Sequence, residues 1–141
     1  MAINTDYKYR IKRNSKQEEQ MKYLIDELKL FQNYPQVLML SAIIGFNNNA
    51  YVKIETPASD GVQTQFFTER NLDYMDFIAY AYKKEQSILN MKEKYEIFES
   101  FANGGFPILI DKLDIDFVDK KKNDRVSLLK KFYTLLLTKK L

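Results

Sequence analysis

The sequence predicts a mainly α-helical single domain of about five to six helices with a short β element near its N-terminus. Several segments place apolar residues at helical spacing. Only four glycines and three prolines occur in 141 residues, which argues against a many-turned all-β fold. The length suits one domain with a real core, so we expect residues 1–141 to form a single domain, with a strand–helix–helix unit at 6–46 and a helical remainder at 66–141.

The β element is predicted from strict alternation over residues 7–13. Side chains of a strand point to its two faces in turn, so one face would be cationic and the other would pack on the protein. The two faces would be Lys8, Arg10 and Lys12 on one side and Tyr7, Tyr9 and Ile11 on the other.

Two helices are expected after this strand. Ser15 followed by Glu18 is a capping box, and an apolar stripe comes after it at i, i+3, i+4 and i+7. The stripe consists of Met21, Leu24, Ile25 and Leu28. Asn33 is expected to cap a second helix, which is apolar nearly all round and should be buried, with Gly45 as its end.

The rest of the chain predicts one short strand and further helices. The strand is expected at residues 51–56, with a loop at 58–65. Helices are expected from about Asn71, from about Ser87 to a stop at residues 103–105, over 106–113, and from about Asp124. The last helix has the apolar residues Val126, Leu129, Phe132, Tyr133, Leu136 and Leu137.

The amino-acid composition excludes several kinds of catalytic and metal-binding site. Cysteine and histidine are both absent, which removes disulfides, thiol nucleophiles, Cys- or His-based zinc sites and the commonest general base. We therefore expect no cofactor, no metal and no enzymatic activity. No apolar run reaches the roughly 20 residues of a membrane span, and the polar N-terminus has no signal-peptide pattern. The expected location is cytoplasmic.

Positive charge is concentrated at the two ends. Residues 1–16 have five cations against one carboxylate, a net +4, and residues 120–141 have eight against one, a net +7. Since the whole chain is +3, the middle must be −8. Basic ends around an acidic middle either bind anions or dock on the middle.

A basic strand followed by two helices has the order of a ribbon–helix–helix unit, in which strands of two protomers pair and enter the major groove of DNA. This predicts DNA as a partner and a homodimer. The predicted nucleic-acid-binding residues are Lys8, Arg10, Lys12 and Arg13, with Lys120, Lys121, Lys122 and Arg125 as a second patch. The alternative is an ordinary edge strand and a solvated basic helix, since lysines also protect sheet edges from aggregation.

Two other functions remain open. A protein–protein adaptor without DNA binding would use the acidic middle and exposed aromatic residues. A metal-dependent nuclease would use Asp114 and Asp116 as magnesium ligands, although no nearby glutamate–lysine pair completes such a motif.

Residues 34 to about 113 resemble a family of small bacterial proteins encoded beside DNA phosphorothioation genes, the Dnd-system-associated proteins. The stretches that carry the resemblance are Tyr-Pro-Gln-Val-Leu-Met-Leu-Ser-Ala-Ile-Ile-Gly-Phe at 34–46 and Ile-Phe-Glu-Ser-Phe-Ala-Asn-Gly-Gly-Phe at 97–106. Residues Ile43 and Ile44 replace smaller or leucine-type residues, a conservative change for packing. The resemblance implies an accessory role in a defence system linked to sulfur-modified DNA, with other defence-system proteins as partners, and it brings no catalytic residue.

Overall fold

The computed structural model describes residues 5–139 and 141, so residues 1–4 and 140 of the predicted domain lie outside this description. Five α-helices and a two-stranded antiparallel sheet make up the fold, which confirms the mainly α prediction. In chain order the elements are β1 (Arg10–Ile11), α1 (Glu18–Lys22) with a π-helical continuation (Tyr23–Glu27), α2 (Tyr34–Asn47), β2 (Val62–Gln63), α3 (Glu69–Lys83), α4 (Glu93–Leu113) and α5 (Arg125–Thr138). Short 3₁₀ turns occupy Ser15–Gln17, Thr64–Phe66, Gln86–Asn90 and Lys120–Lys122.

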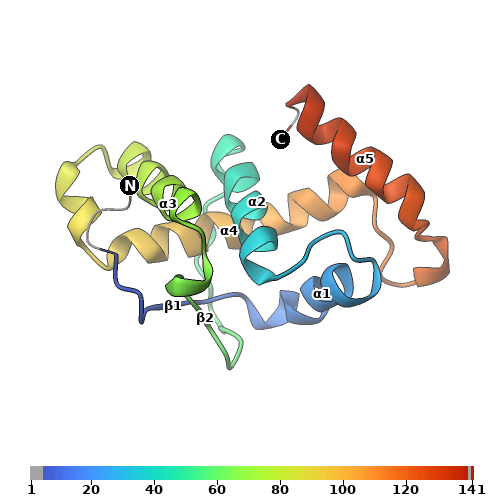
Figure 1. Cartoon of the computed structure of the whole chain (residues 1–141), viewed down its shortest axis with the longest axis horizontal. Helices are drawn as coiled ribbons and strands as arrows, with labels where there is room; N and C mark the ends of the chain where they lie inside the picture. The colour runs from blue at the N-terminus through green and yellow to red at the C-terminus, as the bar shows by residue number, and fades with distance from the viewer. Residues whose placement is uncertain (1–4, 140) are drawn as a thin grey trace.

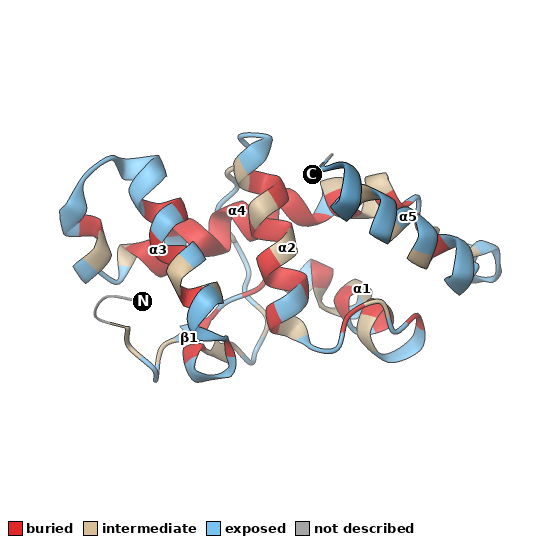
Figure 2. Cartoon of the chain, turned by 45° about the horizontal axis from the view of Figure 1, so that its top comes forward, coloured by how far each residue is buried: buried red, intermediate tan, exposed pale blue. Residues whose placement is uncertain are grey.

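Helix α4 is the centre of the molecule. It runs along the long axis and is crossed by α2, with α3 above it and α1 and the small sheet below it in the view of Figure 1. Most of α4 is buried, whereas α5 is mostly exposed (Figure 2). A single hydrophobic core includes residues from Ile11 to Leu128, so both predicted units contribute to it.

The predicted helix end at residues 103–105 is wrong, because α4 continues through it. Glycines here allow two helix backbones to touch rather than ending a helix. A Cβ on Gly105 would lie 1.8 Å from the Ser41 carbonyl oxygen of α2, and one on Gly45 would lie 2.0 Å from the Phe101 oxygen of α4. Gly45 was likewise expected to end α2, but this helix continues to Asn47.

The helix predicted over residues 106–113 is the second half of α4, with Pro107 inside it. Proline has no N–H, so the Asn103 carbonyl loses its helical donor at i+4. The Gln17 side chain supplies a donor instead, with its Nε2 at 3.1 Å from this oxygen. The proline is therefore tolerated in the helix interior because a side chain replaces the missing hydrogen bond.

The predicted start of the first helix is wrong by one residue. Asn14, not Ser15, caps the 3₁₀ turn Ser15–Gln17 that leads into α1, and its side chain accepts from the Lys16 N–H at 2.9 Å; α1 itself begins only at Glu18. Ser15 donates its backbone N–H to the Thr56 oxygen, and Glu18 pairs with Arg13, so neither completes a capping box. The Asn33 cap of α2 is confirmed, since its side chain accepts from the Gln36 N–H.

The strand predicted at residues 51–56 is wrong. This segment is extended, but it lies along α4 instead of in a sheet, and the Val52 N–H donates to the Ser100 oxygen at 3.1 Å. The sheet partner is β2, inside the predicted loop at 58–65, with Arg10 opposite Gln63 and Ile11 opposite Val62. β1 thus pairs with a strand of its own chain, whereas the predicted ribbon–helix–helix arrangement pairs it with the strand of a second protomer.

Two remaining helices start away from their predicted positions. The helix expected from Ser87 begins as the 3₁₀ turn Gln86–Asn90, and α4 itself starts only at Glu93. Thr68 caps α3 and accepts from the Asn71 N–H, so α3 starts at Glu69, two residues earlier than expected. Among the described residues, no helix has both the length and the apolar composition to cross a membrane.

Candidate functional site

The strand predicted over residues 7–13 is regular only at Arg10–Ile11, and Lys8 lies in the turn before it, but the predicted cationic side chains face solvent. Lys8, Arg10 and Lys12 are all exposed, whereas Ile11 is fully buried and Tyr9 is half-buried. The predicted alternation is therefore confirmed from residue 8 onward. It fails at Tyr7, which lies in a turn and is exposed.

Helix α4 holds this strand in place through Glu99. The carboxylate oxygen Oε2 accepts the Lys12 backbone N–H at 2.7 Å and the Tyr9 hydroxyl at 3.3 Å. The Tyr9 ring also stacks on Tyr95 of α4, with the centroids 4.4 Å apart. The edge of β1 that does not face β2 is thus bound to α4, which fixes the direction of its exposed side chains.

Asn103, one helical turn after Glu99, ties the next part of the chain to α4. Its Oδ1 accepts from Asn14 Nδ2 at 2.9 Å and from Gln17 Nε2 at 3.1 Å. Its Nδ2 donates to the Val52 oxygen at 2.9 Å. A single buried amide therefore connects the strand-to-helix turn, the extended segment at 51–54 and α4.

Burial dominates the electrostatics of Glu99 and raises the pKa of its carboxyl to about 7. The N–H and the charge of Lys12 and the Tyr9 hydroxyl oppose this shift, because they favour the ionised form. Burial and the neighbouring Glu99 charge also raise the pKa of Tyr9, so this tyrosine stays neutral. The contact between β1 and α4 thus includes a carboxyl that titrates near neutral pH.

Raising the pH from 5 to 8 is expected to destabilise the protein through Glu99. The folded state binds the proton more tightly than the unfolded state, whose carboxyl has a pKa near 4.5. The stabilisation is therefore complete below about pH 4.5 and is lost as pH rises through 7, with a contribution of up to about 3 kcal/mol. The contribution of Glu99 is measured as the change in the free energy of unfolding with pH. Urea titrations at several pH values give this free energy for wild type and for Glu99→Gln.

The matched control is Glu96→Gln, because Glu96 is exposed and lies one turn before Glu99. The Glu96 charge is the smallest of the named causes that act on the Glu99 pKa, so we expect this variant to retain most of the pH dependence and Glu99→Gln to lose it. Equal pH profiles for wild type and Glu99→Gln would contradict the assignment.

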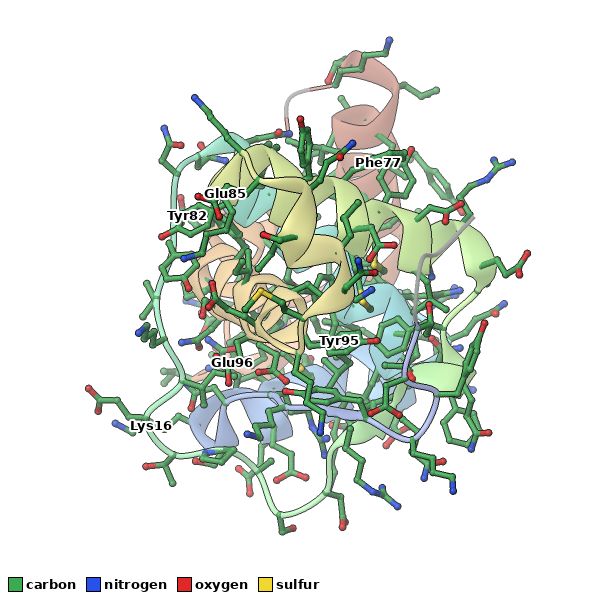
Figure 3. All side chains as sticks on the ribbon, turned by 90° about the vertical axis from the view of Figure 1, so that its left-hand side faces the viewer. Lys16, Phe77, Tyr82, Glu85, Tyr95 and Glu96 are labelled. Atoms are coloured by element: carbon green, nitrogen blue, oxygen red, sulfur yellow. The ribbon has the colours of Figure 1, made fainter. Side chains whose placement is uncertain are left out.

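A cleft of about 450 Å³ lies beside the strand, between the end of β1, α3 and α4. Its walls include Tyr51 and Tyr82, whose rings stack at 4.7 Å, and Lys83, which pairs with Glu93 at 2.8 Å. The charged lining residues are Lys12, Lys53, Lys83, Glu93, Glu96 and Glu99. Tyr82 and Glu96 lie on the same side of the start of α4, away from Phe77 (Figure 3). Because both signs of charge are present, this cleft has no preference for anions.

Arg13 was predicted to contact nucleic acid, but the structure places it inside the fold. It is only 5% exposed, and its Nη2 pairs with Glu18 Oε1 at 2.9 Å. Its Nη1 donates to the Asp60 oxygen, and its guanidinium lies 4.2 Å from the centre of the Tyr34 ring. Alternation places this side chain on the inward face together with Ile11. Arg13 is therefore occupied with structural contacts.

The second predicted basic patch is far from the first. Lys120, Lys121 and Lys122 are exposed in a 3₁₀ turn just before α5, at the opposite end of the molecule from β1 (Figure 1). Lys120 also lies 4.5 Å over the Tyr23 ring. Arg125 donates from Nε to the Leu28 oxygen at 2.9 Å, so it fastens the start of α5 to the segment after α1.

The acidic residues considered for a nuclease have other contacts. Asp116 accepts the N–H groups of Val118 and Asp119 at 2.9 and 2.8 Å, and these bonds lower the pKa of its carboxyl. Asp114 lies 3.7 Å from Lys131. Within residues 5–139 and 141, no group of three or more Asp, Glu, His or Cys residues is arranged to hold a metal ion.

Sequence reasoning missed Glu99 and Asn103, although a pattern pointed to them. Tyr95, Glu99 and Asn103 follow each other at i+4, so the two polar residues share a helix face with the buried Tyr95. A polar side chain on a buried face needs a partner, and here the partners come from the N-terminal segment.

Comparison with known proteins gives one family match. The model of the family described as DNA sulphur modification system-associated protein 4 matches residues 10–134. Comparisons with curated proteins and with solved structures gave no match. The family match extends from β1 into α5 and covers far more than half of the chain. The chain therefore belongs to the family of DNA sulphur modification system-associated protein 4.

Proposed function

We propose that this protein is a non-catalytic accessory component of a DNA sulphur modification system that contacts DNA through β1. The family assignment gives the association with the system. The observation that carries the DNA contact is that Lys8, Arg10 and Lys12 are all exposed in and beside β1, in a segment bound to α4 through Tyr9 and the Lys12 N–H. Cations on a fixed backbone bind phosphates with little loss of conformational entropy.

The three cations differ in their surroundings. Arg10 lies over the loop before β2, where its Nη1 is 3.3 Å from the Gly61 oxygen. Lys12 lines the cleft that also contains three glutamates. Lys8 and Arg10 are therefore the main phosphate contacts in this proposal, and Lys12 contributes less. The lysines at 120–122 form a second contact region for phosphate.

Binding to an unmodified, labelled DNA duplex at a series of salt concentrations tests the proposal. The variant Lys8→Ala/Arg10→Ala/Lys12→Ala is expected to bind more weakly at low salt. Since each phosphate contact contributes about one unit to the slope of log affinity against log salt, the slope should fall by up to about three. Fluorescence anisotropy of the labelled duplex gives both quantities.

A control variant with the same charge separates this site from a general charge effect. Lys83→Ala/Lys84→Asn/Lys92→Ala also removes three exposed cations, but none lies within residues 8–12 or 120–131; Asn suits the left-handed backbone at position 84. It should keep the wild-type salt slope. If both variants lose the same DNA affinity and salt slope, the contact of β1 with DNA is contradicted.

A protein-docking adaptor without DNA binding is the second candidate. The observation that favours it is the outer face of α3, where Tyr74, Phe77 and Tyr80 are exposed, Phe77 by 67%. Aromatic residues are enriched in protein interfaces. Wild-type protein that fails to bind the duplex even at low salt would favour this candidate over DNA binding.

A further inference from the structure

Helix α5 packs with only one of its faces. Leu128 is its one buried residue among those described, and Phe132 packs edge-on against Phe31 at 5.3 Å. Val126 and Tyr133 are each 57% exposed and Leu137 is 83% exposed (Figure 2). The sequence leads one to expect a buried apolar stripe here, but much of that stripe faces solvent.

The exposed side of α5 borders a groove. About 590 Å³ of space lies between α5 and α2, with Leu40 and Ile43 on the α2 wall and Leu129 and Leu136 on the α5 wall. Groove and exposed stripe form one continuous apolar surface, since Tyr133 belongs to both. A contiguous apolar surface of this kind marks an interaction site.

The spacing of the apolar residues on α5 matches a helical partner. Val126, Leu129, Tyr133 and Leu136 follow each other at steps of three and four residues. Such steps form the seam of two packed helices, in which side chains of one helix fill gaps between those of the other. The α5 seam has no partner helix along this side within the described residues of the chain.

The charge around the groove selects the partner. No carboxylate is among the residues that line it, whereas Lys29 and Arg125 are. Residues 125–138 of α5 include Arg125, Lys130 and Lys131 and no Asp or Glu. Although Arg125 Nε is bonded to a backbone oxygen, its positive charge remains at the groove. A second copy of this chain would bring the same cations, so like charges would oppose self-association through this face.

We propose that the groove between α2 and α5 binds an amphipathic helix of a partner protein, with apolar residues on one face and Asp and Glu residues beside them. The apolar face fills the groove along the α5 seam, and the carboxylates lie next to Lys29, Arg125 and Lys130. This is the helix-in-groove mode of recognition. The groove is separate from the proposed main DNA contact at β1, because β1 and α5 lie at different ends of the molecule (Figure 1).

A display library of helical peptides with randomised surface positions tests the proposal. The full chain serves as bait, and Tyr133→Glu/Leu137→Glu serves as the counter-selection bait, since both residues are exposed and their replacement should leave the fold intact. We expect the enriched peptides to combine apolar residues at i, i+3 or i+4 and i+7 with an excess of Asp and Glu. The most enriched peptide, once synthesised, should bind Tyr133→Glu/Leu137→Glu at least tenfold more weakly than it binds wild type.

Two controls make the result specific. Tyr74→Glu/Phe77→Glu adds the same charges to exposed aromatic residues on α3, and it should bind the winning peptide as wild type does. The same peptide with Lys in place of each Glu should lose binding. The proposal is overturned if no peptide prefers wild type over Tyr133→Glu/Leu137→Glu, if the winners lack acidic residues, or if sedimentation shows a wild-type dimer that Tyr133→Glu/Leu137→Glu dissociates.

Discussion

Replacing Gly105 with alanine is expected to destabilise the protein by about 3 kcal/mol or more. Alanine is normally the better helix residue, by about 1 kcal/mol over glycine in a helix interior. Here its Cβ would lie 1.8 Å from the Ser41 carbonyl oxygen and 2.6 Å from the Gly45 nitrogen, both backbone atoms of α2. The two helices can accept it only by moving apart, which opens the core along their whole contact.

Urea unfolding followed by circular dichroism measures the effect, and Pro107→Ala is the matched control. Pro107 is exposed and lies two residues further along the same helix. Its replacement restores an N–H to the helix and adds no atom to the core, so stability should be unchanged or higher. If Gly105→Ala unfolds at the wild-type urea concentration, the close crossing of α2 and α4 is incorrect.

The second large effect is expected at a buried ion pair between α3 and α4. Lys94 Nζ lies 2.9 Å from Asp76 Oδ1, with the two side chains only 2% and 8% exposed. Lys94 also donates to the Leu89 oxygen at 2.9 Å. Asp76→Leu would leave the ammonium group buried without its counter-charge, which typically costs about 3–5 kcal/mol. The free energy of unfolding from urea titration should fall by this amount.

Replacing both partners should restore most of the loss. In Asp76→Leu/Lys94→Met neither charge remains, so the desolvation cost disappears with the attraction. Methionine has nearly the volume of lysine, and the larger volume of leucine at position 76 is common to both variants, so their difference reports the charge. The exposed pair of Lys83 and Glu93 provides the comparison, since Glu93→Ala should cost less than about 1 kcal/mol. A double variant that is as unstable as Asp76→Leu would show that the loss comes from packing and not from charge.

Local patterns in the sequence predicted most helices and the alternation of the strand. Asn33 and Asp124 lie at the starts of their helices as expected, because capping depends only on residues nearby. The wrong helix end at residues 103–105 also came from a local pattern. Asparagine and two glycines normally end a helix, and only the tertiary structure shows that Gly105 serves the crossing with α2 and Gly104 a close approach of the Ala50 backbone.

The sequence predicted which side chains of the candidate site are exposed, but not the contacts that hold them in place. Exposure of Lys8, Arg10 and Lys12 follows from alternation. The burial of Arg13 follows from it too, although Arg13 was predicted to contact nucleic acid. The role of Glu99 depends on a contact across 87 residues of sequence, which no local pattern contains. The open face of α5 was equally hidden, because its apolar residues suggested a helix covered on that side.

Helix α4 also acts as a rigid spacer. The β1 strand is held at Glu99, whereas α5 lies beside the other end of the helix, which finishes at Leu113. Fourteen residues of α-helix correspond to about 21 Å. DNA on β1 and a partner helix on α5 would therefore be held apart by roughly six base pairs of duplex, at 3.4 Å per pair. The length of one helix thus sets how far from the DNA backbone a docked protein would be positioned.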